Sequence, residues 1–324
     1  MKRFFSVAPM MKKTDKHFRF LCSHLSKKSF LFTEMIHCNA ILRGDSSKLL
    51  SYHNCENPLS LQLGGSDPKD LGAAIQIANK YNYDEINLNV GCPSKKVKSG
   101  NFGVFLMKDI PLLQKCIVEM KKNTSLPITI KCRVGVDEYE GEKFLNDFIE
   151  RITDVGVTTY FIHARKAISG LDTKRNRSIP PLMYEKVYRI KDKFPDLEVI
   201  LNGGISDANE LDNHLKKVDG VMLGRKVYSD PSFLLSIDKD LYDEDTFCSI
   251  DNALKEYMNY ILNLDNRKDS NRAINHLMQF IKSLSIEKNK RKEILEKLNN
   301  KNEELNSIFD DFTQGCQRNL SPNL

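Results

Sequence analysis

Short runs of aliphatic and β-branched residues alternate with longer amphipathic segments through the first two-thirds of the chain. The longer segments, such as 67–81, 110–122 and 143–155, carry apolar residues at helical spacing. Because strands that alternate with helices run parallel, this pattern predicts an α/β fold closed into a (β/α)8 TIM barrel. An open, doubly wound sheet is the alternative, but no G-x-G-x-x-G motif follows the first strand. The eight predicted strands are 4–10, 31–36, 59–63, 85–90, 128–134, 160–165, 198–202 and 220–223.

The pattern changes after about Pro231. Three segments, 252–264, 271–284 and 288–299, have a helical period, and no strand-like run accompanies them. We therefore expect a small all-helical C-terminal domain after an acidic connector at 238–245. The expected division is a barrel domain over 1–238, a helical domain over 246–312 and a frayed tail over 313–324.

The composition is that of an ordinary globular protein, with 40% hydrophobic and 28% charged residues in a chain of 324. No apolar run could span a bilayer, and the N-terminal segment becomes basic too soon for a secretory signal. The eight cysteines include no C-x-x-C pair, which argues against a zinc site or a disulfide framework. We expect a reduced, cytoplasmic chain without a metal. The net charge of +6 permits a nucleic-acid partner without requiring one.

Residues 85–103 indicate chemistry most directly. A strand-like run ends at Gly91, Cys92 follows, the chain turns at Pro93, and a basic loop continues to Gly103. For an arbitrary cysteine, a buried structural role is the more common one. In an α/β barrel, however, the carboxyl ends of the strands carry the active site, so this placement favours a functional thiol.

Glycines mark the ends of the last two predicted strands. Gly203, Gly204 and Gly224 would expose backbone N–H groups at the position where this fold commonly binds phosphate. Arg225 adds a cation there. A single Gly-Gly pair is usually only a turn, but two such turns on neighbouring strands predict a phosphate site.

Three further polar residues, Gln62, Lys131 and His163, lie near strand ends. Lys131 is either a solvated strand end or a cation directed at an anionic ring, and His163 is either a core histidine or a ligand contact. Gln62 is a buried amide that needs partners, which the edge of a heterocycle could supply. Together these residues predict a pocket for a planar, singly phosphorylated cofactor, and flavin mononucleotide (FMN) fits best. Pyridoxal phosphate is the alternative, since Lys131 could form a Schiff base.

With these motifs in order, the chain resembles the tRNA-dihydrouridine synthases, flavoenzymes that reduce uridine in tRNA. The resemblance is strongest to their bacterial-type A branch, which modifies D-loop positions 20 and 20a. It covers the whole barrel, whereas the helical tail is less distinctive. The matching motifs are APMM at Pro9, NPLSLQLGGSDP at 57–68, YDEINLNVGCPS at 83–94, GNFGVFLM at 100–107, KCRVGVD at 131–137, FIHARKA at 161–167, NRSIPPL at 176–182, NGGI at 202–205 and VDGVMLGR at 218–225.

The resemblance implies a role for each matched residue. Cys92 would protonate C5 of the uracil while reduced flavin delivers a hydride to C6, and NADPH would be the electron donor. An ordinary thiol, with a pKa of about 8.5, still holds its proton at neutral pH. The implied FMN-binding residues are Pro9, Met10, Gln62, Lys131, His163, Asn202, Gly203, Gly204, Gly224 and Arg225. The implied tRNA-binding residues of the barrel are Asn89, Lys174, Asn176 and Arg177.

A uracil base reaches the floor of a barrel only if its nucleotide swings out of the tRNA, so the mouth needs a basic rim. In the helical tail, the cluster 288–292 is a candidate tRNA contact, because the family grips tRNA with its helical domain; we assign Lys290, Arg291 and Lys292 to it. We expect a monomer. The basic side chains expected around the mouth are Lys95, Lys96, Lys98, Arg165, Lys166, Lys174, Arg175 and Arg177.

Two other functions are open. A flavin-dependent oxidoreductase of a free pyrimidine, of the dihydroorotate or dihydropyrimidine type, would need neither the basic loops nor the helical tail. A catalytically silent tRNA-binding protein would not need Cys92, Lys131 and His163 together.

Overall fold

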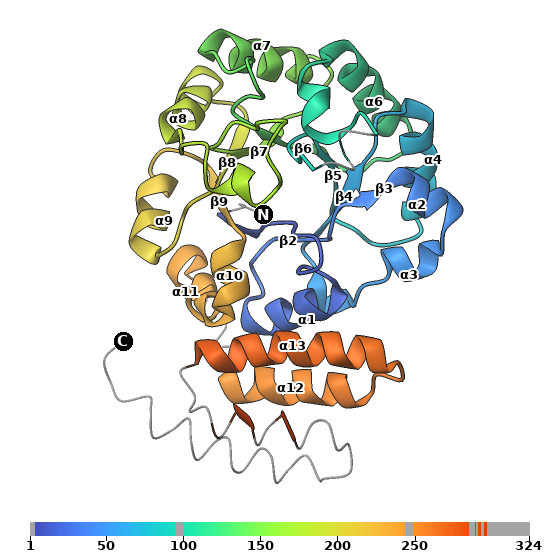
Figure 1. The fold of residues 1–324 in the computed structure, drawn as a ribbon, viewed down its shortest axis with the longest axis vertical. Helices are drawn as coiled ribbons and strands as arrows, with labels where there is room; N and C mark the ends of the chain where they lie inside the picture. The colour runs from blue at the N-terminus through green and yellow to red at the C-terminus, as the bar shows by residue number, and fades with distance from the viewer. Residues whose placement is uncertain are drawn as a thin grey trace. The chain divides into compact units, whose positions relative to one another are not determined.

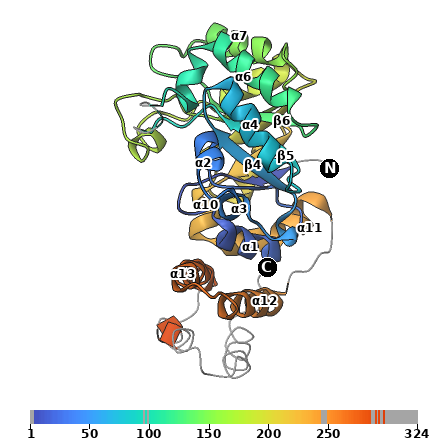
Figure 2. The same ribbon diagram turned by 90° about the vertical axis from the view of Figure 1, so that its right-hand side faces the viewer.

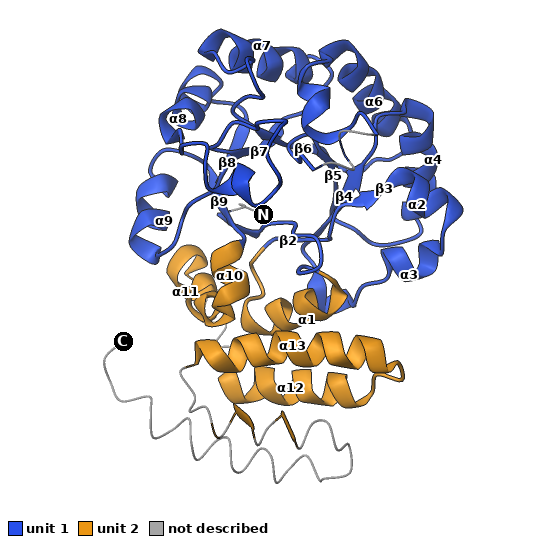
Figure 3. Cartoon of the chain, in the orientation of Figure 1, with its two compact units in different colours: residues 1–14, 30–224 blue, residues 15–29, 225–324 orange. Residues whose placement is uncertain are grey.

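The computed structural model describes residues 4–94, 97, 100–243, 249–284, 289, 291–292 and 295–296. The chain divides into two compact units (Figure 3). Unit 1 comprises Met1–Thr14 and Phe30–Gly224, and unit 2 comprises Asp15–Ser29 and Arg225–Leu324.

Unit 1 is a closed parallel barrel (Figure 1). Neighbouring strands follow the order β1-β9-β8-β7-β6-β5-β4-β2, and a parallel bridge between Ser6 and Phe30 closes the circle. The predicted TIM barrel is therefore confirmed. Its strands are β1 (Phe5–Val7), β2 (Leu31–Phe32), β4 (Leu59–Gly64), β5 (Glu85–Asn89), β6 (Ile128–Arg133), β7 (Thr159–His163), β8 (Glu198–Asn202) and β9 (Gly220–Leu223).

One predicted strand, 31–36, is interrupted. It forms β2 and a separate short strand, β3 (Ile36–His37), which pairs with β4. Between them the hydroxyl of Thr33 accepts the backbone N–H of Gln62 at 3.0 Å, in the place of a main-chain carbonyl. A side chain thus breaks the regular ladder, which the apolar pattern could not indicate.

The helices of unit 1 lie outside its strands (Figure 1), and Figure 2 shows the same ribbon from the side. Several begin at a capping aspartate: Asp67 accepts the N–H of Asp70, and Asp109 accepts the N–H of Leu112. The predicted helices 67–81, 110–122 and 143–155 are confirmed as α4, α6 and α7, with small shifts at their ends. The helices of unit 1 are α2 (Cys38–Arg43), α3 (Ser46–Leu50), α4 (Pro68–Ala78), α6 (Ile110–Lys122), α7 (Glu142–Thr153), α8 (Tyr184–Lys193) and α9 (Ala208–Leu215), with 3-10 turns η1 (Asn54–Glu56), η2 (Gly103–Met107) and η3 (Arg175–Arg177).

The interior of the barrel has an apolar half and a polar half. Successive residues of a strand face opposite sides, so every second residue points inward. From β1, β2, β7, β8 and β9, or directly beside them, comes a buried apolar cluster: Ala8, Phe30, Phe32, Phe161, Ile200 and Met222. From β4, β5 and β6 come buried polar side chains: Ser60, Gln62, Glu85, Asn87, Asn89 and Thr129.

Unit 2 is helical, which confirms the predicted helical C-terminal region. The first helix of the chain, α1, packs against α12 and α13. Phe18, Tyr257 and Phe280 are fully buried between these helices, and the Tyr257 hydroxyl donates to the carbonyl of His17 at 3.0 Å. The helices of unit 2 are α1 (Lys16–Leu25), α10 (Arg225–Ser229), α11 (Ile237–Tyr242), α12 (Ile250–Leu262) and α13 (Arg267–Ser283), with the 3-10 turn η4 (Pro231–Ser236).

The expected acidic connector at 238–245 is wrong in its first part, because α11 occupies it and Asp238 is buried. The Asp238 carboxylate accepts the backbone N–H groups of Lys27 at 2.7 Å and Lys28 at 3.1 Å, and the hydroxyl of Ser26. The division into domains at 1–238, 246–312 and 313–324 stays a prediction. Residues 313–324 and most of the predicted helix 288–299 lie outside the described residues. Within the described part of the chain, no helix has both the length and the apolar character needed to cross a bilayer.

Replacing Asp238 by Ala should destabilise the protein by about 2 kcal/mol, because buried donors lose their acceptor. The midpoint of urea unfolding measures this change. The matched control is Asp240→Ala on the same helix, where the side chain is exposed and the expected change is under about 0.5 kcal/mol. Equal midpoints for the two variants would contradict the role of Asp238 as a buried acceptor for Ser26, Lys27 and Lys28.

Candidate active site

Cys92 lies directly after β5 and is partly exposed. The side-chain carbonyl of Asn89 accepts the backbone N–H of Cys92 at 2.9 Å and that of Gly91 at 3.2 Å. On the other side of the turn, the Cys92 carbonyl accepts the N–H of Val104 at 3.1 Å. The backbone that carries the thiol is therefore held from both directions.

Gly103 allows the returning chain to pass close to this turn. Its φ is +60°, and a Cβ added there would lie 2.8 Å from the carbonyl oxygen of Cys92 and 2.6 Å from Val97. Both the left-handed conformation and the lack of space require glycine at this position. The glycine after the basic loop thus serves the geometry around Cys92.

Lys131 extends from β6 towards β8. Its Nζ donates to Oδ1 of Asn202 at 2.7 Å, and Nδ2 of Asn202 donates to the carbonyl of Met222 at 2.7 Å. Burial, together with the smaller effect of the charge of Arg133, lowers the pKa of Lys131 from its ordinary value of 10.5 to about 7. An ammonium held by a neutral amide in a low-dielectric site would be favoured by an anionic ligand. The structure thus brings together Lys131 and Asn202, as the predicted cofactor site requires.

The Gly203–Gly204 turn follows β8 and lies against His163. Both glycines have positive φ, +116° and +83°. A Cβ on Gly203 would lie 2.5 Å from Cδ2 of His163, and one on Gly204 would lie 2.5 Å from the Tyr184 hydroxyl. That hydroxyl donates to the Gly203 carbonyl at 2.9 Å. This turn can therefore be formed only by residues without side chains.

Met10 and Gly224 lie side by side at the ends of β1 and β9, where the Met10 sulfur is 3.1 Å from the position that a Cβ on Gly224 would take. The Met10 N–H donates to the hydroxyl of Thr14 at 2.9 Å. Pro9, directly before Met10, is partly exposed. Arg225 is the first residue of α10 and belongs to unit 2.

Gln62 finds its partners inside the protein. Its Nε2 donates to Oδ1 of Asn87 at 2.9 Å, and its Oε1 accepts Nδ2 of Asn89 at 2.9 Å. The buried amide therefore does not need a heterocycle to satisfy it, although each amide group has capacity for one more bond.

Asn176 was expected to contact tRNA at the surface, but its side chain lies inside the protein. The side chain is fully buried; its Oδ1 accepts the N–H of Ile168 at 2.8 Å, and its Nδ2 donates to the carbonyls of Ile168 and Leu171, both at 2.9 Å. It shapes the loop between β7 and α8, on which Lys174 is exposed and Arg177 is partly exposed. A contact between tRNA and the Asn176 side chain stays a prediction.

Arg133 is a residue of this site that the sequence analysis missed. It is almost fully buried and donates to the carbonyls of Gly91 at 2.9 Å, Lys166 at 3.1 Å and Asn176 at 3.1 Å. It therefore ties the Cys92 turn to the loop after β7. Burial lowers the pKa of Arg133 to about 10, and the guanidinium groups of Arg177 and Arg165 lower it too, against the opposing effect of Cys92. Its spacing of two residues from Lys131, which places both on one face of β6, was the available signal.

Some predicted residues cannot be placed at this site. Lys95, Lys96, Lys98 and Lys290 lie outside the described residues. Arg291 and Lys292 belong to unit 2, where Lys292 pairs with Glu296 at 3.7 Å on an exposed surface.

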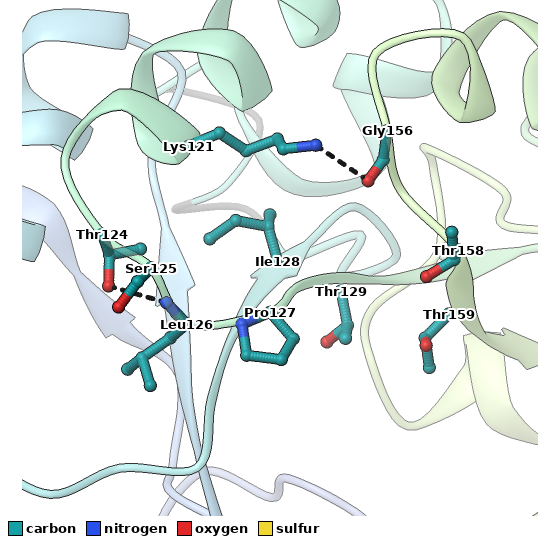
Figure 4. Close-up of a pocket in the computed structure, with 10 residues that line it drawn as sticks. All are labelled: Lys121, Thr124, Ser125, Leu126, Pro127, Ile128, Thr129, Gly156, Thr158 and Thr159. Carbon is teal, nitrogen blue, oxygen red and sulfur yellow. Dashed lines mark hydrogen bonds between the residues drawn. The ribbon is translucent and has the colours of Figure 1, made fainter.

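A pocket also lies at the amino-terminal ends of β6 and β7, the opposite ends from Cys92 (Figure 4). Lys121 donates there to the carbonyl of Gly156 at 3.1 Å. Within the described residues, no group of three or more His, Cys, Asp and Glu side chains is placed to hold a metal ion. The pocket is lined by Lys121, Thr124, Ser125, Leu126, Pro127, Ile128, Thr129, Gly156, Thr158 and Thr159.

A partly exposed thiol, a lysine of lowered pKa and glycine turns lie at the carboxyl ends of parallel strands, where α/β-barrel enzymes carry their active sites. Among solved structures, the chain is similar to 2-naphthoyl-CoA reductase in complex with 2-naphthoyl-CoA, with a TM-score of 0.56 and 8% identity. The alignment covers 72% of this chain and 50% of that one, so the chain spans about half the length of that structure. This likeness supports the barrel fold.

The sequence profile of the dihydrouridine synthase (Dus) family matches residues 6–317. The tRNA-dihydrouridine(20/20a) synthase of Synechocystis is 45% identical over 238 residues, which are 73% of this chain and 71% of the relative. The protein of the same name from Xanthomonas campestris is 42% identical over 280 residues, 86% of this chain and 82% of the relative. The chain belongs to the dihydrouridine synthase family and is a flavin-dependent oxidoreductase. The predicted family and enzyme class are confirmed.

The lowered pKa of Lys131 predicts a pH dependence of folding for the ligand-free protein. Between pH 7 and 10.5 the unfolded chain holds a proton on this lysine that the folded chain does not hold, so this group makes stability rise with pH. From pH 6.5 to 8.5, urea unfolding should show wild type gaining roughly 1–2 kcal/mol relative to Lys131→Met. Lys143→Met, which replaces an exposed lysine of α7, should follow wild type. Parallel pH curves for wild type and Lys131→Met would contradict the buried environment of the ammonium.

Proposed function

We propose that this protein is an FMN-dependent tRNA-dihydrouridine synthase. It reduces the C5=C6 bond of uridine in the D-loop of tRNA, at position 20 or 20a, with NADPH as electron donor. Two kinds of observation support the proposal: the curated relatives that carry this activity in their names, and the residues at the mouth of the barrel. The observation that carries it is Cys92, partly exposed on a backbone turn that Asn89 holds at the end of β5.

The mouth of the barrel suits FMN. Lys131 would face the anionic edge of the reduced ring, where an anion would offset the burial that lowers the pKa of this lysine. Asn202 orients the ammonium, while His163 and the Gly203–Gly204 turn form the adjacent wall. FMN, when bound there, supplies the hydride that reaches C6. Pro9, Met10, Gln62, Gly224 and Arg225 complete the proposed cofactor site.

Cys92 is the proposed proton donor to C5 of the uracil. The bonds to Asn89 and Val104 fix its backbone, and the carbonyl just before it accepts from Arg133. Arg133 lies close enough to Cys92 for the two charges to interact once the thiol has given up its proton. Solvent can then return a proton to the partly exposed sulfur.

The rim of the barrel favours RNA over a free pyrimidine. Arg165 and Arg177 are close enough to Arg133 to lower its pKa, so positive charge is concentrated on the loop after β7. Tyr139, 42% exposed, lies on the loop after β6 and offers a stacking surface in a chain without tryptophan. A small substrate would need neither feature. The proposed tRNA contacts are Asn89, Lys174, Asn176 and Arg177 of the barrel, with Lys290, Arg291 and Lys292 of the helical region. We also propose that the enzyme acts as a cytoplasmic monomer without a metal.

The decisive test is position-mapped nucleoside analysis of unmodified tRNA after incubation with the purified protein and NADPH. We expect bound FMN and dihydrouridine at position 20 or 20a, and no product from free uridine. Cys92→Ala should retain FMN and tRNA binding while product falls by roughly 100-fold or more, as loss of general acid catalysis predicts. Cys55→Ala, a partly exposed cysteine in η1, is the control. A colourless protein that refuses FMN, or a Cys92→Ala variant with the wild-type rate, would overturn the proposal.

Lys174→Ala should weaken tRNA binding without changing single-turnover reduction at saturating tRNA, because an exposed lysine contacts phosphate and not the uracil. The dependence of log Kd on log salt concentration should become shallower by about 1. Lys193→Ala, at the end of α8 away from the barrel mouth, should leave both quantities unchanged. An unaltered salt dependence for Lys174→Ala would remove this residue from the tRNA contacts.

A further inference from the structure

A continuous chain of hydrogen bonds between buried side chains runs through the polar half of the barrel. It links Glu85, Thr129, Asn87, Gln62 and Asn89, and we call these five residues the polar chain. All are buried, and the first four are at most 1% exposed. Nδ2 of Asn89 donates to Oε1 of Gln62 at 2.9 Å, and Nε2 of Gln62 donates to Oδ1 of Asn87 at 2.9 Å. Nδ2 of Asn87 donates to the Thr129 hydroxyl at 2.8 Å, which donates to Oε1 of Glu85 at 3.1 Å.

The register of the strands produces this path. Gln62, Asn87 and Thr129 occupy paired positions on β4, β5 and β6, so their side chains point inward at the same level. Glu85 lies two residues below Asn87 on β5, and Asn89 lies two residues above it. The polar chain therefore crosses three strands at mid-height and reaches from the floor of the barrel to the Cys92 turn.

The two ends of the polar chain determine its direction. At the upper end, the backbone N–H groups of Gly91 and Cys92 can only donate, so Asn89 must direct its oxygen towards them. Each following amide must then accept from the residue above and donate to the one below. At the lower end, the Thr129 hydroxyl donates to a carboxyl oxygen. Every amide orientation is therefore fixed by the network, without reference to how oxygen and nitrogen are assigned.

Packing alone does not require polar groups here. The other half of the same interior is filled by Phe32, Phe161, Ile200 and Met222, so apolar residues can fill a barrel of this size. Buried amides are costly unless they are hydrogen-bonded, and aligned hydrogen bonds strengthen one another. All hydrogen bonds of the polar chain point in one direction, from Asn89 to Glu85. This indicates that the polar half of the barrel has a positioning role.

We propose that Glu85 and Thr129, at the floor of the barrel, are positioning residues for Cys92. Through Asn87, Gln62 and Asn89, they keep the Asn89 carbonyl directed at the turn that carries the thiol. Neither touches the reacting atoms. The catalytic consequence rests on the proposed function, whereas the effect on the turn does not.

The test compares two Thr→Val substitutions, each of which removes a hydroxyl while nearly preserving the shape of the side chain. Thr129→Val cuts the polar chain. Thr159→Val, at the same level of neighbouring β7, removes a bond of 2.9 Å from a threonine hydroxyl to Glu198, which is not part of the polar chain. Hydrogen exchange of the Gly91 and Cys92 amides should accelerate roughly tenfold in Thr129→Val and not in Thr159→Val, because only the first weakens the bonds to Asn89. The rate at which iodoacetamide alkylates Cys92, followed by mass spectrometry, should also change in Thr129→Val and not in Thr159→Val.

Turnover provides the second measurement. In Thr129→Val, kcat should fall roughly tenfold with KM for tRNA retained, and Thr159→Val should keep both. Glu85→Gln still offers an oxygen to Thr129 and should retain most of kcat, whereas Glu85→Met offers none and should behave like Thr129→Val. Equal effects of the two threonine variants on amide exchange, or equal loss in Glu85→Gln and Glu85→Met, would overturn the proposal. If wild type makes no dihydrouridine, the proposed function fails, and amide exchange and alkylation still decide the positioning role.

Discussion

The side chain of Asn89 joins the interior of the barrel to the turn that carries Cys92. Its oxygen holds two backbone amides of that turn, and its nitrogen is bound to Gln62 inside the barrel. Because one planar amide serves both purposes, the turn cannot rotate without breaking bonds in the core. On the far side, Arg133 holds Gly91 and the loop after β7 together. The Cys92 turn is thus anchored to the strands of the barrel, the arrangement that the proposed proton donor needs.

A partly buried lysine, Lys131, and a buried arginine, Arg133, make the mouth of the barrel electrostatically unfavourable in the absence of ligands. Within the described residues, Nζ of Lys131 donates to a neutral amide and Arg133 donates to carbonyls, so neither charge is balanced by a carboxylate in these contacts. Burial shifts both pKa values downward. Charge of this kind reduces folding stability and becomes favourable when an anionic ring or an RNA phosphate arrives. If the proposed function holds, the same residues therefore connect cofactor binding, substrate binding and the stability of the fold.

The strands could be predicted from the sequence because each is a short apolar run bounded by glycine, proline or polar residues. Alternation also placed Lys131 on the inward face of β6. The same alternation applies to Arg133, but a cation at the end of a strand is usually solvated, and its carbonyl partners come from loops far away in the sequence. Gln62 was expected to bind a heterocycle because the sequence does not show that Asn87 and Asn89 lie beside it. Asp238 looked like part of a charged connector, since nothing local reveals its partners 210 to 212 residues earlier. Long-range partners of polar side chains are what a one-dimensional pattern lacks.

The grouping of α1 with α12 and α13 has a consequence for biosynthesis. The apolar face of α1, which includes Phe18, Leu21 and Leu25, leaves the ribosome more than 220 residues before the helices that cover it. Barrel strands β2 to β9 are all translated in this interval. A nascent chain therefore carries an uncovered apolar helix until its last quarter emerges, and translation that stops before α12 leaves that surface available to chaperones and to aggregation.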